Sequence, residues 1–272
     1  MTKSPAVSVL MTAYNVQKYI GLAIESILSQ TFSDFEFIIL DDASTDRTWQ
    51  IIQDYSKNDS RITALKNETN LGISASRNRL VSIAKGKYIV WQDADDISLL
   101  PRLEKQYQFM EANPQVGICG GWLHFFNQDR NISIRKYRSQ DADLRRRIFR
   151  YSPVAQPAAI IRKDALEKTG RYDESLAVAE DLDMSFRLGR DCQFANLPEI
   201  IVKYREHSGS TTYKKIKELE KNTFKIRRRF LADKHYHFSS IDFFYNLVQF
   251  STMYLLPPRI RVAFFNFIRN VR

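Results

Sequence analysis

The sequence predicts an α/β protein with a doubly wound, mostly parallel sheet, followed by a helical extension that is basic and aromatic. Two observations lead to this prediction. Apolar, strand-like runs alternate with helical patterns in the first half, as in parallel sheets whose strands are joined by helices. The 272-residue chain also divides by charge: residues 1–199 hold 26 basic and 26 acidic residues, whereas residues 200–272 hold 15 and 5. We therefore expect a neutral domain, residues 1–212, and a basic extension, residues 213–272.

The spacing of apolar residues predicts the individual elements. Four short apolar runs are typical of buried parallel strands: residues 7–11, 35–40, 62–65 and 87–91. Helical spacing links them at residues 17–30, 49–55 and 72–84. The second half is less regular. It predicts a helix at 101–113, a strand broken by glycines at 116–123, a strand at 154–161, a helix at 180–188 and a very basic helix at 214–235.

Composition excludes several classes of protein. The chain is 44% hydrophobic and 12% aromatic, which excludes global disorder. Its two cysteines are too few for a disulfide framework and are typical of a reducing compartment. We expect no secretory signal, and the longest uncharged stretch, residues 243–258, is shorter than the roughly 18 to 20 apolar residues of a spanning helix. These features predict a cytoplasmic protein, with peripheral binding to the inner face of the membrane as a further expectation.

Acidic residues cluster where two predicted strands end. Asp41-Asp42 follows the second strand, and Asp93, Asp95 and Asp96 follow the fourth. In open parallel sheets, ligands bind at the carboxyl ends of the strands. Carboxylates this close repel one another, and a hard divalent cation such as Mg²⁺ or Mn²⁺ relieves that repulsion. The pattern favours a metal site, although Asp41-Asp42 could instead belong to a capped turn and Asp96 could cap the following helix.

Other nucleotide and metal chemistries lack their motifs. No glycine-rich loop of the dinucleotide-binding or P-loop type occurs in the sequence. The four histidines show no i, i+4 spacing, so a histidine zinc site is not expected. If a nucleotide binds, we expect aspartates to hold it through a metal instead of a glycine-rich loop. Such a site is typical of nucleotide-sugar transfer or of nucleotidyl transfer.

Seven segments together resemble family 2 glycosyltransferases of the GT-A fold. In chain order they are VSVLMTAYN, SILSQTF, FEFIILDDASTDRT, NLGISASRN, GKYIVWQDADD, GRYDESLAVAEDLDMSFRL and YREHSGSTT. Each segment is weak alone, but seven in the family's order, from residue 7 to about 212, are highly specific. Ala43 is a mild departure, because the family most often has glycine there in an Asp-Asp-Gly-Ser turn. The resemblance implies a GT-A domain over residues 1–212.

The resemblance also implies a nucleotide site. Thr12, Tyr14 and Asp42 match the positions that hold the nucleobase, usually uracil. Tyr14 would offer a stacking face, and Asp42 would accept a hydrogen bond from the ring N–H. Arg77 and Asn78 match a basic and amide pair near the nucleotide and its diphosphate. The alternatives are simple packing for Tyr14 and an exposed helix face for the pair.

Metal-binding and catalytic roles follow from the same resemblance. Asp93 matches an aspartate that contacts the ribose or sugar, and Asp95, beside it, matches the ligand of Mn²⁺ or Mg²⁺. His207 matches a position near the metal or diphosphate, where it would be a ligand or a structural side chain. Glu180-Asp181 matches the family's acidic pair, with Asp181 as general base for the acceptor hydroxyl. A solvated helix start is the alternative for that pair.

The expected function is therefore a metal-dependent, inverting hexosyl- or N-acetylhexosaminyltransferase. The donor would be a nucleotide sugar, with UDP as the expected nucleotide. The acceptor would be a saccharide or lipid-linked saccharide in surface polysaccharide or glycolipid assembly. One carboxylate opposite one leaving group implies a single displacement and a β-glycosidic product. The alternatives are a metal-dependent nucleotidyltransferase, which needs no distant base such as Asp181, and a non-catalytic binding protein.

The composition of the extension favours a membrane surface over nucleic acid. Its basic stretch, residues 214–234, precedes the aromatic stretch, residues 236–258, whereas nucleic-acid surfaces interleave basic and aromatic residues. Apolar anchors beside cations suit an anionic membrane surface. The alternative is that the aromatic residues pack on the body or form a homo-oligomer interface.

Overall fold

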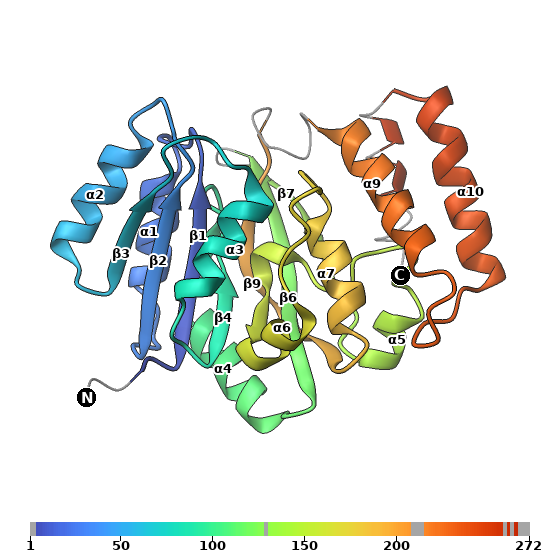
Figure 1. Ribbon diagram of the computed structural model, residues 1–272, viewed down its shortest axis with the longest axis horizontal. Coiled ribbons are helices and arrows are strands. Elements are labelled where there is room, and N and C mark those ends of the chain that lie inside the picture. Colours follow the sequence, from blue (N-terminus) through green and yellow to red (C-terminus); the bar gives the residue numbers. More distant parts are fainter. Residues whose placement is uncertain (1–3, 128–129, 208–214, 258–259, 262–263, 266–272) are drawn as a thin grey trace.

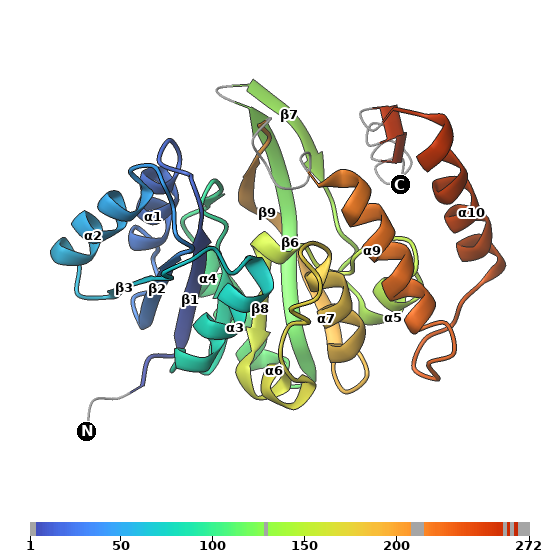
Figure 2. The ribbon, with the colours of Figure 1, turned by 45° about the horizontal axis from the view of Figure 1, so that its top comes forward.

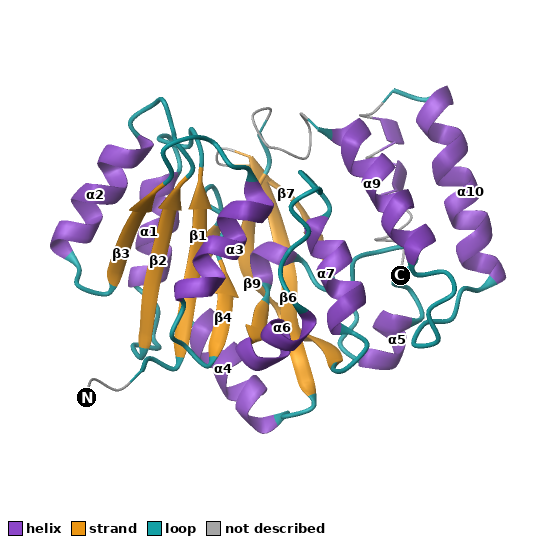
Figure 3. Cartoon of the chain, in the orientation of Figure 1, coloured by secondary structure: helices purple, strands orange, loops and turns teal. Residues whose placement is uncertain are grey.

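A single mixed sheet organises the protein (Figure 1, Figure 3). The computed structural model describes residues 4–127, 130–207, 215–257, 260–261 and 264–265. Within these residues, the strand order is β3-β2-β1-β4-β8-β6-β9-β5, with β7 paired to β6. The strands are β1 (Val7–Ala13), β2 (Phe35–Asp41), β3 (Ile62–Lys66), β4 (Tyr88–Trp91), β5 (Ile97–Ser98), β6 (Val116–Asn127), β7 (Arg130–Arg135), β8 (Ile160–Arg162) and β9 (Gln193–Arg205). Strands β1 to β4 run parallel, as do β6 and β9, whereas β5, β7 and β8 are antiparallel to their neighbours.

Helices cover both faces of this sheet. They are α1 (Ile20–Leu28), α2 (Thr48–Asn58), α3 (Ile73–Ile83), α4 (Arg102–Ala112), α5 (Asp141–Arg145), α6 (Lys163–Thr169), α7 (Glu180–Leu188), α9 (Ile216–Arg229) and α10 (Ser240–Leu255). Successive side chains of a strand point to opposite faces. Val9 of β1 therefore packs in the cluster that includes α1, α2 and α4, and Leu10 in the cluster that includes α3, α6 and α7. The predicted doubly wound, mostly parallel sheet is confirmed.

Two strands predicted in the second half differ from those observed, and β5, β7 and β9 have no predicted counterpart. Strand β6 is continuous over Val116–Asn127 and is not broken by its glycines. A Cβ atom on Gly121 would lie 2.6 Å from a side-chain carbon of Ile201, so the glycines allow β9 to approach closely. The strand predicted at residues 154–161 is limited to β8, because a short 3-10 helix over Gln156–Ala158 precedes it. Pro157 lies in that turn, where it cannot donate to a strand ladder.

The C-terminal extension packs against the body (Figure 1, Figure 2). Ile226 and Phe230 are buried in the same cluster as α3, α6 and α7, and the Phe230 ring stacks on Phe186 with centroids 4.6 Å apart. The predicted domain boundary at residues 212–213 lies outside the described residues. The predicted basic helix corresponds to α9, and the aromatic residues that follow form α10. Among the described helices, none combines the length and apolar character needed to cross a membrane.

The turn that carries Asp42 is under backbone strain. Ala43 adopts φ 59°, in the left-handed region, where a side chain costs roughly 1–2 kcal/mol and glycine costs nothing. This strain explains why glycine is common at this position of the motif.

We predict that Ala43→Gly stabilises the protein by about 0.5 to 1 kcal/mol, because relief of strain exceeds the extra entropy of glycine in the unfolded chain. Urea unfolding followed by circular dichroism measures the change. The matched control is Ala142→Gly in α5, where the backbone is helical and the same change should destabilise by about 0.5 to 1 kcal/mol. Equal loss of stability in both variants would contradict the prediction.

Candidate active site

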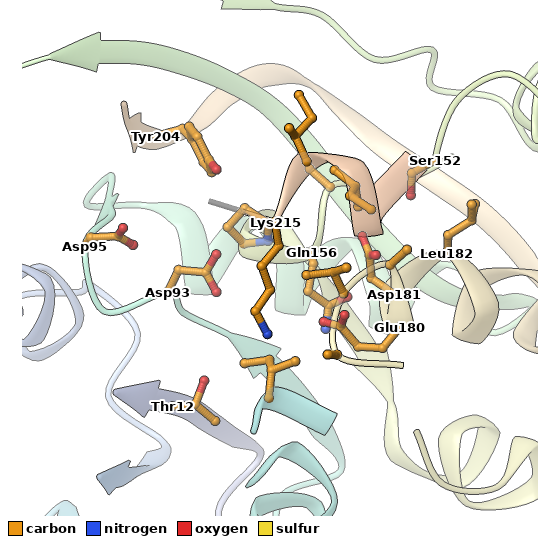
Figure 4. A pocket seen from close by; sticks show the side chains of 18 of the residues that line it. Thr12, Asp93, Asp95, Ser152, Gln156, Glu180, Asp181, Leu182, Tyr204 and Lys215 are labelled. Atoms are coloured by element: carbon orange, nitrogen blue, oxygen red, sulfur yellow. The ribbon is translucent and has the colours of Figure 1, made fainter. Parts of the chain in front are cut away.

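A cleft of about 1100 Å³ lies at the carboxyl ends of β1, β2 and β4 and continues beneath the C-terminal extension. Its lining brings together all but one of the site residues that the sequence predicts. Figure 4 shows Asp93 and Asp95 on one side of this space and Glu180 and Asp181 across from them. The cleft therefore places two pairs of acids opposite each other.

The β1 end of the cleft carries two of the predicted nucleobase residues. Thr12 is the last residue but one of β1, and Tyr14, which is 49% exposed, follows the strand at the rim. Asn15 adopts φ 52°, and its Oδ1 accepts a hydrogen bond of 2.8 Å from the backbone N–H of Thr45. This contact ties the loop after β1 to the loop after β2. An exposed aromatic ring on a fixed loop suits stacking on a base.

Asp42 organises the entrance to α3 as well as lining the cleft. Its carboxylate accepts hydrogen bonds of 2.9 Å from the backbone N–H groups of Leu71 and Gly72, and one of 2.6 Å from Asn67 Nδ2. Gly72 adopts φ 84°, which glycine tolerates best. Both oxygens of Asp42 therefore already support the loop that leads into α3.

Arg77 lies between the two acidic pairs. Its guanidinium is buried, forms an ion pair with Glu180 and lies 3.9 Å from Asp93 Oδ1. The rings of Trp91 and Tyr172 flank it, with centroids 5.1 Å and 5.7 Å from Cζ. Burial alone would lower the pKa of Arg77, but the surrounding charges, Glu180 foremost, raise it above its usual value. Arg77 is therefore a permanent cation that links the two sides of the cleft.

Asn78 does not line the cleft, contrary to its predicted place beside the nucleotide. Its side chain exchanges two hydrogen bonds with the backbone of Tyr172, of 3.0 Å and 2.8 Å, and donates a third to Glu174. Successive helical residues point about 100° apart, so Arg77 and Asn78 of α3 face different surroundings. Asn78 instead fixes the segment that leads toward Glu180.

Asp93, Asp95 and His207 bring metal-ligating atoms to one edge of the cleft. Asp95 Oδ2 lies 2.8 Å from His207 Nε2. At this distance the two side chains are hydrogen-bonded to each other, and a metal held by both atoms would replace that hydrogen bond. Burial, opposed by Arg77, raises the pKa of Asp93 to about 6. Among the described residues, no three acidic, histidine or cysteine side chains are gathered closely enough to form a complete metal site. The donor set nevertheless fits Mn²⁺ or Mg²⁺, since carboxylate oxygens predominate.

Asp96 does not cap the following helix. It is buried, and its Oδ1 accepts a hydrogen bond of 2.8 Å from the backbone N–H of Arg205. Helix α4 begins after Pro101 without a side-chain cap. Asp96 therefore attaches β9, and with it His207, to the loop that carries Asp95.

Glu180 and Asp181 begin α7, after a strained residue. Ala179 adopts φ 67° and directs the chain into the helix at the cleft wall. Glu180 is buried against Arg77, whereas Asp181 is partly exposed to the cleft. Burial first, and the adjacent Glu180 second, raise the pKa of Asp181 to about 6, although Arg77 opposes the shift. The two acids thus differ: one is held in an ion pair, and the other is a stronger base than an ordinary aspartate.

Several lining residues have no signal in the sequence that marks them as part of a site. They are Asn15, Asp46, Gln156, Tyr204, Lys215 and Arg227. Lys215 precedes α9 and extends into the space between the acidic pairs (Figure 4). The sequence shows that Lys215 and Arg227 belong to a basic segment. It does not show that this segment faces the cleft.

Comparison with solved structures identifies the fold as GT-A. Staphylococcus aureus TarS 1–349, solved in complex with UDP, superposes with a TM-score of 0.68 at 19% identity over 92% of this chain and 72% of TarS. A mannosyltransferase from Pyrobaculum calidifontis, solved with GDP-Man and Mn²⁺, has a TM-score of 0.66 at 18% identity over 93% of this chain and 71% of its own. At such identities the likeness shows the fold alone.

Sequence comparison gives the family. Residues 8–170 match the family described as glycosyl transferase family 2. An uncharacterized glycosyltransferase of Methanocaldococcus jannaschii is 34% identical over 94% of this chain and 91% of its own length. An Escherichia coli enzyme, UDP-Glc:alpha-D-GlcNAc-diphosphoundecaprenol beta-1,3-glucosyltransferase WfaP, is 31% identical over 78% of this chain and 82% of its own. The chain belongs to the family 2 glycosyltransferases.

Proposed function

We propose that this protein is an inverting glycosyltransferase that transfers a hexose or N-acetylhexosamine from a UDP-sugar to a lipid-linked saccharide. The single observation that carries this proposal is the placement of Asp181 across one cleft from Asp93 and Asp95. Acids that face each other can act on opposite sides of one anomeric carbon. The product would be a β-glycoside in surface polysaccharide or glycolipid assembly.

Asp181 is the general base in this proposal. Its raised pKa makes it a better proton acceptor, and it is open to the cleft, where an acceptor hydroxyl would bind. The acceptor oxygen would attack the anomeric carbon while the bond to the nucleoside diphosphate breaks on the far side, and the proton would pass to Asp181. A single displacement inverts the configuration at the anomeric carbon.

Glu180 is a positioning residue in this scheme. Its carboxylate is paired with Arg77, so it is not available to accept a proton. The pair fixes the start of α7 and thereby the direction of the Asp181 side chain. The predicted catalytic pair is thus divided into one proton acceptor and one residue that orients it.

The nucleotide and metal would occupy the side of the cleft formed by β1, β2 and β4. Thr12, Tyr14 and Asp42 lie where a nucleobase would bind, and Asp93, Asp95 and His207 would hold Mn²⁺ or Mg²⁺. A bound divalent cation would neutralise the leaving diphosphate. Support for UDP and for a lipid diphosphate acceptor comes from the name of the WfaP relative. Membership of the family leaves the nucleotidyltransferase and the non-catalytic binding protein without support.

We predict that Asp181→Asn lowers kcat by about 10² to 10⁴, because the amide cannot accept a proton. In the unchanged protein, kcat/KM should fall as the pH drops through about 6, where Asp181 becomes protonated. Initial-rate measurements from pH 4.5 to 8 test both statements. UDP binding, measured by calorimetry, serves as the control and should persist in Asp181→Asn. Near-normal turnover of that variant would remove Asp181 from this role, and an α-linked product by NMR would refute inversion.

We predict that UDP binding and sugar transfer both require a divalent cation. Chelator should abolish transfer and Mn²⁺ should restore it. Asp95→Ala should weaken metal-dependent UDP binding while the protein stays folded, since Asp96 makes the buried contact to Arg205. Asp96→Ala is the contrasting variant and should lower the melting temperature instead. Full activity in excess chelator would be incompatible with a metal-dependent mechanism.

The outer surface of α10 supports peripheral membrane binding. The helix exposes a large apolar surface that includes Ile241, Phe244, Tyr254 and Leu255, with side chains 63–77% exposed. Its one charged residue, Asp242, is buried. Helix α9 adds an exposed basic row at 217, 221 and 225. Apolar side chains insert at a membrane interface, and each basic residue near an anionic leaflet adds about 1 kcal/mol.

We predict that Phe244→Ser combined with Leu255→Ser abolishes sedimentation with phosphatidylglycerol vesicles, and that added salt weakens binding of the unchanged protein. The control pair is Leu71→Ser with Leu100→Ser, which are 54% and 56% exposed on the body and should leave binding intact. Point variants are needed, because deleting residues 236–272 would remove Tyr236 from the core. Conversion of a dimer to a monomer, without any vesicle binding, would show an oligomer interface instead.

A further inference from the structure

The C-terminal extension forms one wall of the cleft at the end away from the nucleotide side. Ile216, Leu219, Arg227 and Tyr245 line it there, beside Asp181 of the body. The Asn222 side chain donates a hydrogen bond of 3.1 Å to the backbone carbonyl of Val178, which fixes α9 close to the start of α7. Whatever binds along this wall therefore lies next to the proposed base.

Arg227 is a buried cation in this wall. Arg227 is only 6% exposed. Its guanidinium donates hydrogen bonds of 2.8 Å to Asn246 Oδ1, 2.8 Å to Gln249 Oε1 and 2.7 Å to the backbone carbonyl of Arg150. All three acceptors are neutral. Within the described part of the chain, Arg227 has no carboxylate in ion-pair contact and its Nε–H has no acceptor. A buried charge is costly unless an opposite charge compensates it.

The neighbouring cations are already compensated. Arg150 pairs with Asp242 at 2.6 Å, and Arg261 pairs with Glu220 at 2.7 Å. Each of these acids therefore balances another arginine. Burial lowers the pKa of Arg227 to about 10, although Tyr245 and Asp242 oppose the shift, and Arg227 is still charged at neutral pH. Asp242 therefore acts on both Arg150 and Arg227, and its single negative charge cannot balance both. Among the described residues, this end of the cleft thus carries an excess positive charge that an anion would balance.

The charge of the cleft therefore differs between its two ends. The nucleotide end holds Asp93 and Asp95, which suit a metal and the diphosphate that it neutralises. The extension end holds Arg227, beside the apolar side chains of Ile216 and Leu219. An arginine next to apolar side chains suits a phosphate that is attached to an apolar chain.

We propose that Arg227 binds the phosphate of the acceptor substrate, a saccharide attached through a diphosphate to an apolar chain. The proposal rests on the proposed function, because it assigns the acceptor of that same reaction. Arg227 would hold the diphosphate while the sugar hydroxyl reaches Asp181. Arg227 is then a residue that determines acceptor specificity, and it takes no part in proton transfer.

A purely structural role for Arg227 makes a different prediction. Its three hydrogen bonds join α9, α10 and the loop at Arg150, and this alone could explain its burial. Gln249→Glu separates the two roles, because it keeps the shape and the hydrogen bond but places a carboxylate against the guanidinium. The structural role predicts an equally or more stable protein with unchanged acceptor binding. The phosphate site predicts a stable protein that binds the anion more weakly.

The first experiment measures binding of decyl diphosphate by calorimetry, with UDP and Mn²⁺ at saturation so that the donor site is filled. We expect one site, weakened about 10- to 100-fold in Arg227→Gln and in Gln249→Glu, as for a lost charge-assisted contact. Arg227→Lys should retain part of the affinity. The matched control is Arg228→Gln, an exposed neighbour on α9, which should bind like the unchanged protein.

The second experiment compares two acceptors with the same sugar, one a decyl diphosphate derivative and the other a neutral decyl glycoside. In Gln249→Glu, KM should rise about 10- to 100-fold for the diphosphate acceptor and change less than about twofold for the neutral one. The value of kcat should be unchanged for both. Hydrolysis of the UDP-sugar without acceptor should also be unchanged. This hydrolysis tests the proposed function independently of how the acceptor is bound.

Two results would overturn the inference. One is equal decyl diphosphate affinity in the unchanged protein and a folded Gln249→Glu variant, with UDP-sugar hydrolysis intact. The other is loss of binding to phosphatidylglycerol vesicles in Gln249→Glu while decyl diphosphate binding is retained, which would assign Arg227 to a membrane headgroup. Absence of UDP-sugar hydrolysis in the unchanged protein would instead reject the proposed function.

Discussion

The buried ion pair between Arg77 and Glu180 is the interaction on which the arrangement of the cleft depends. It joins α3, on the proposed nucleotide side, to α7, on the proposed acceptor side. Removing one partner of such a pair leaves an uncompensated buried charge, at a cost of about 3–5 kcal/mol. Neither helix can therefore move independently without a large penalty. The pair also brings Arg77 within 3.9 Å of Asp93, so one guanidinium connects the proposed base and metal sides.

Helix α3 reinforces this connection with its other buried polar residues. Ser74 donates a hydrogen bond of 2.6 Å to the carbonyl of Leu176, and Asn78 holds Tyr172 and Glu174. The segment before Glu180 is thus bound to α3 at several points. This support allows Ala179 to keep its left-handed conformation and to direct Asp181 into the cleft. Strained backbone persists at such places only when surrounding contacts determine it.

The sequence predicts the first half of the fold well, because β1, β2 and β4 are buried along their length and read as continuous apolar runs. It does not predict β9. That strand contains Pro198 and Glu199, which lie at a register shift against β6, and such residues hide a strand pattern. Motif resemblance located Asp93, Asp95, Asp181 and His207 around one cleft. It misplaced Asn78, because neighbours along a helix face different directions.

The extension shows why charge alone does not indicate a partner. Its basic and aromatic composition favoured an anionic membrane surface as the partner, but its arginines have different surroundings in the structure. Arg261 is compensated by Glu220, Arg229 bonds to Asp183 of α7, and Arg227 is buried among neutral oxygens. The apolar side chains divide in the same way: Phe230 packs in the core, and Phe244 remains exposed on α10. These distinctions depend on which face of each helix meets the body, and only the three-dimensional packing reveals them.

A cleft with acids at one end and an uncompensated arginine at the other imposes a direction on its ligands. A nucleoside diphosphate without a metal would be repelled by Asp93 and Asp95. Near Arg227, the carboxylates of Glu220 and Asp242 are already paired with Arg261 and Arg150, so they are poor ligands for a metal. Each end therefore disfavours the ligand that suits the other end. Asp181 lies between the two ends. The burial that raises its pKa also strengthens the electrostatic interaction of each end with a bound ligand. In the proposed function, this arrangement would orient a donor and an anionic acceptor toward one base, and Arg227 of the extension would select the acceptor.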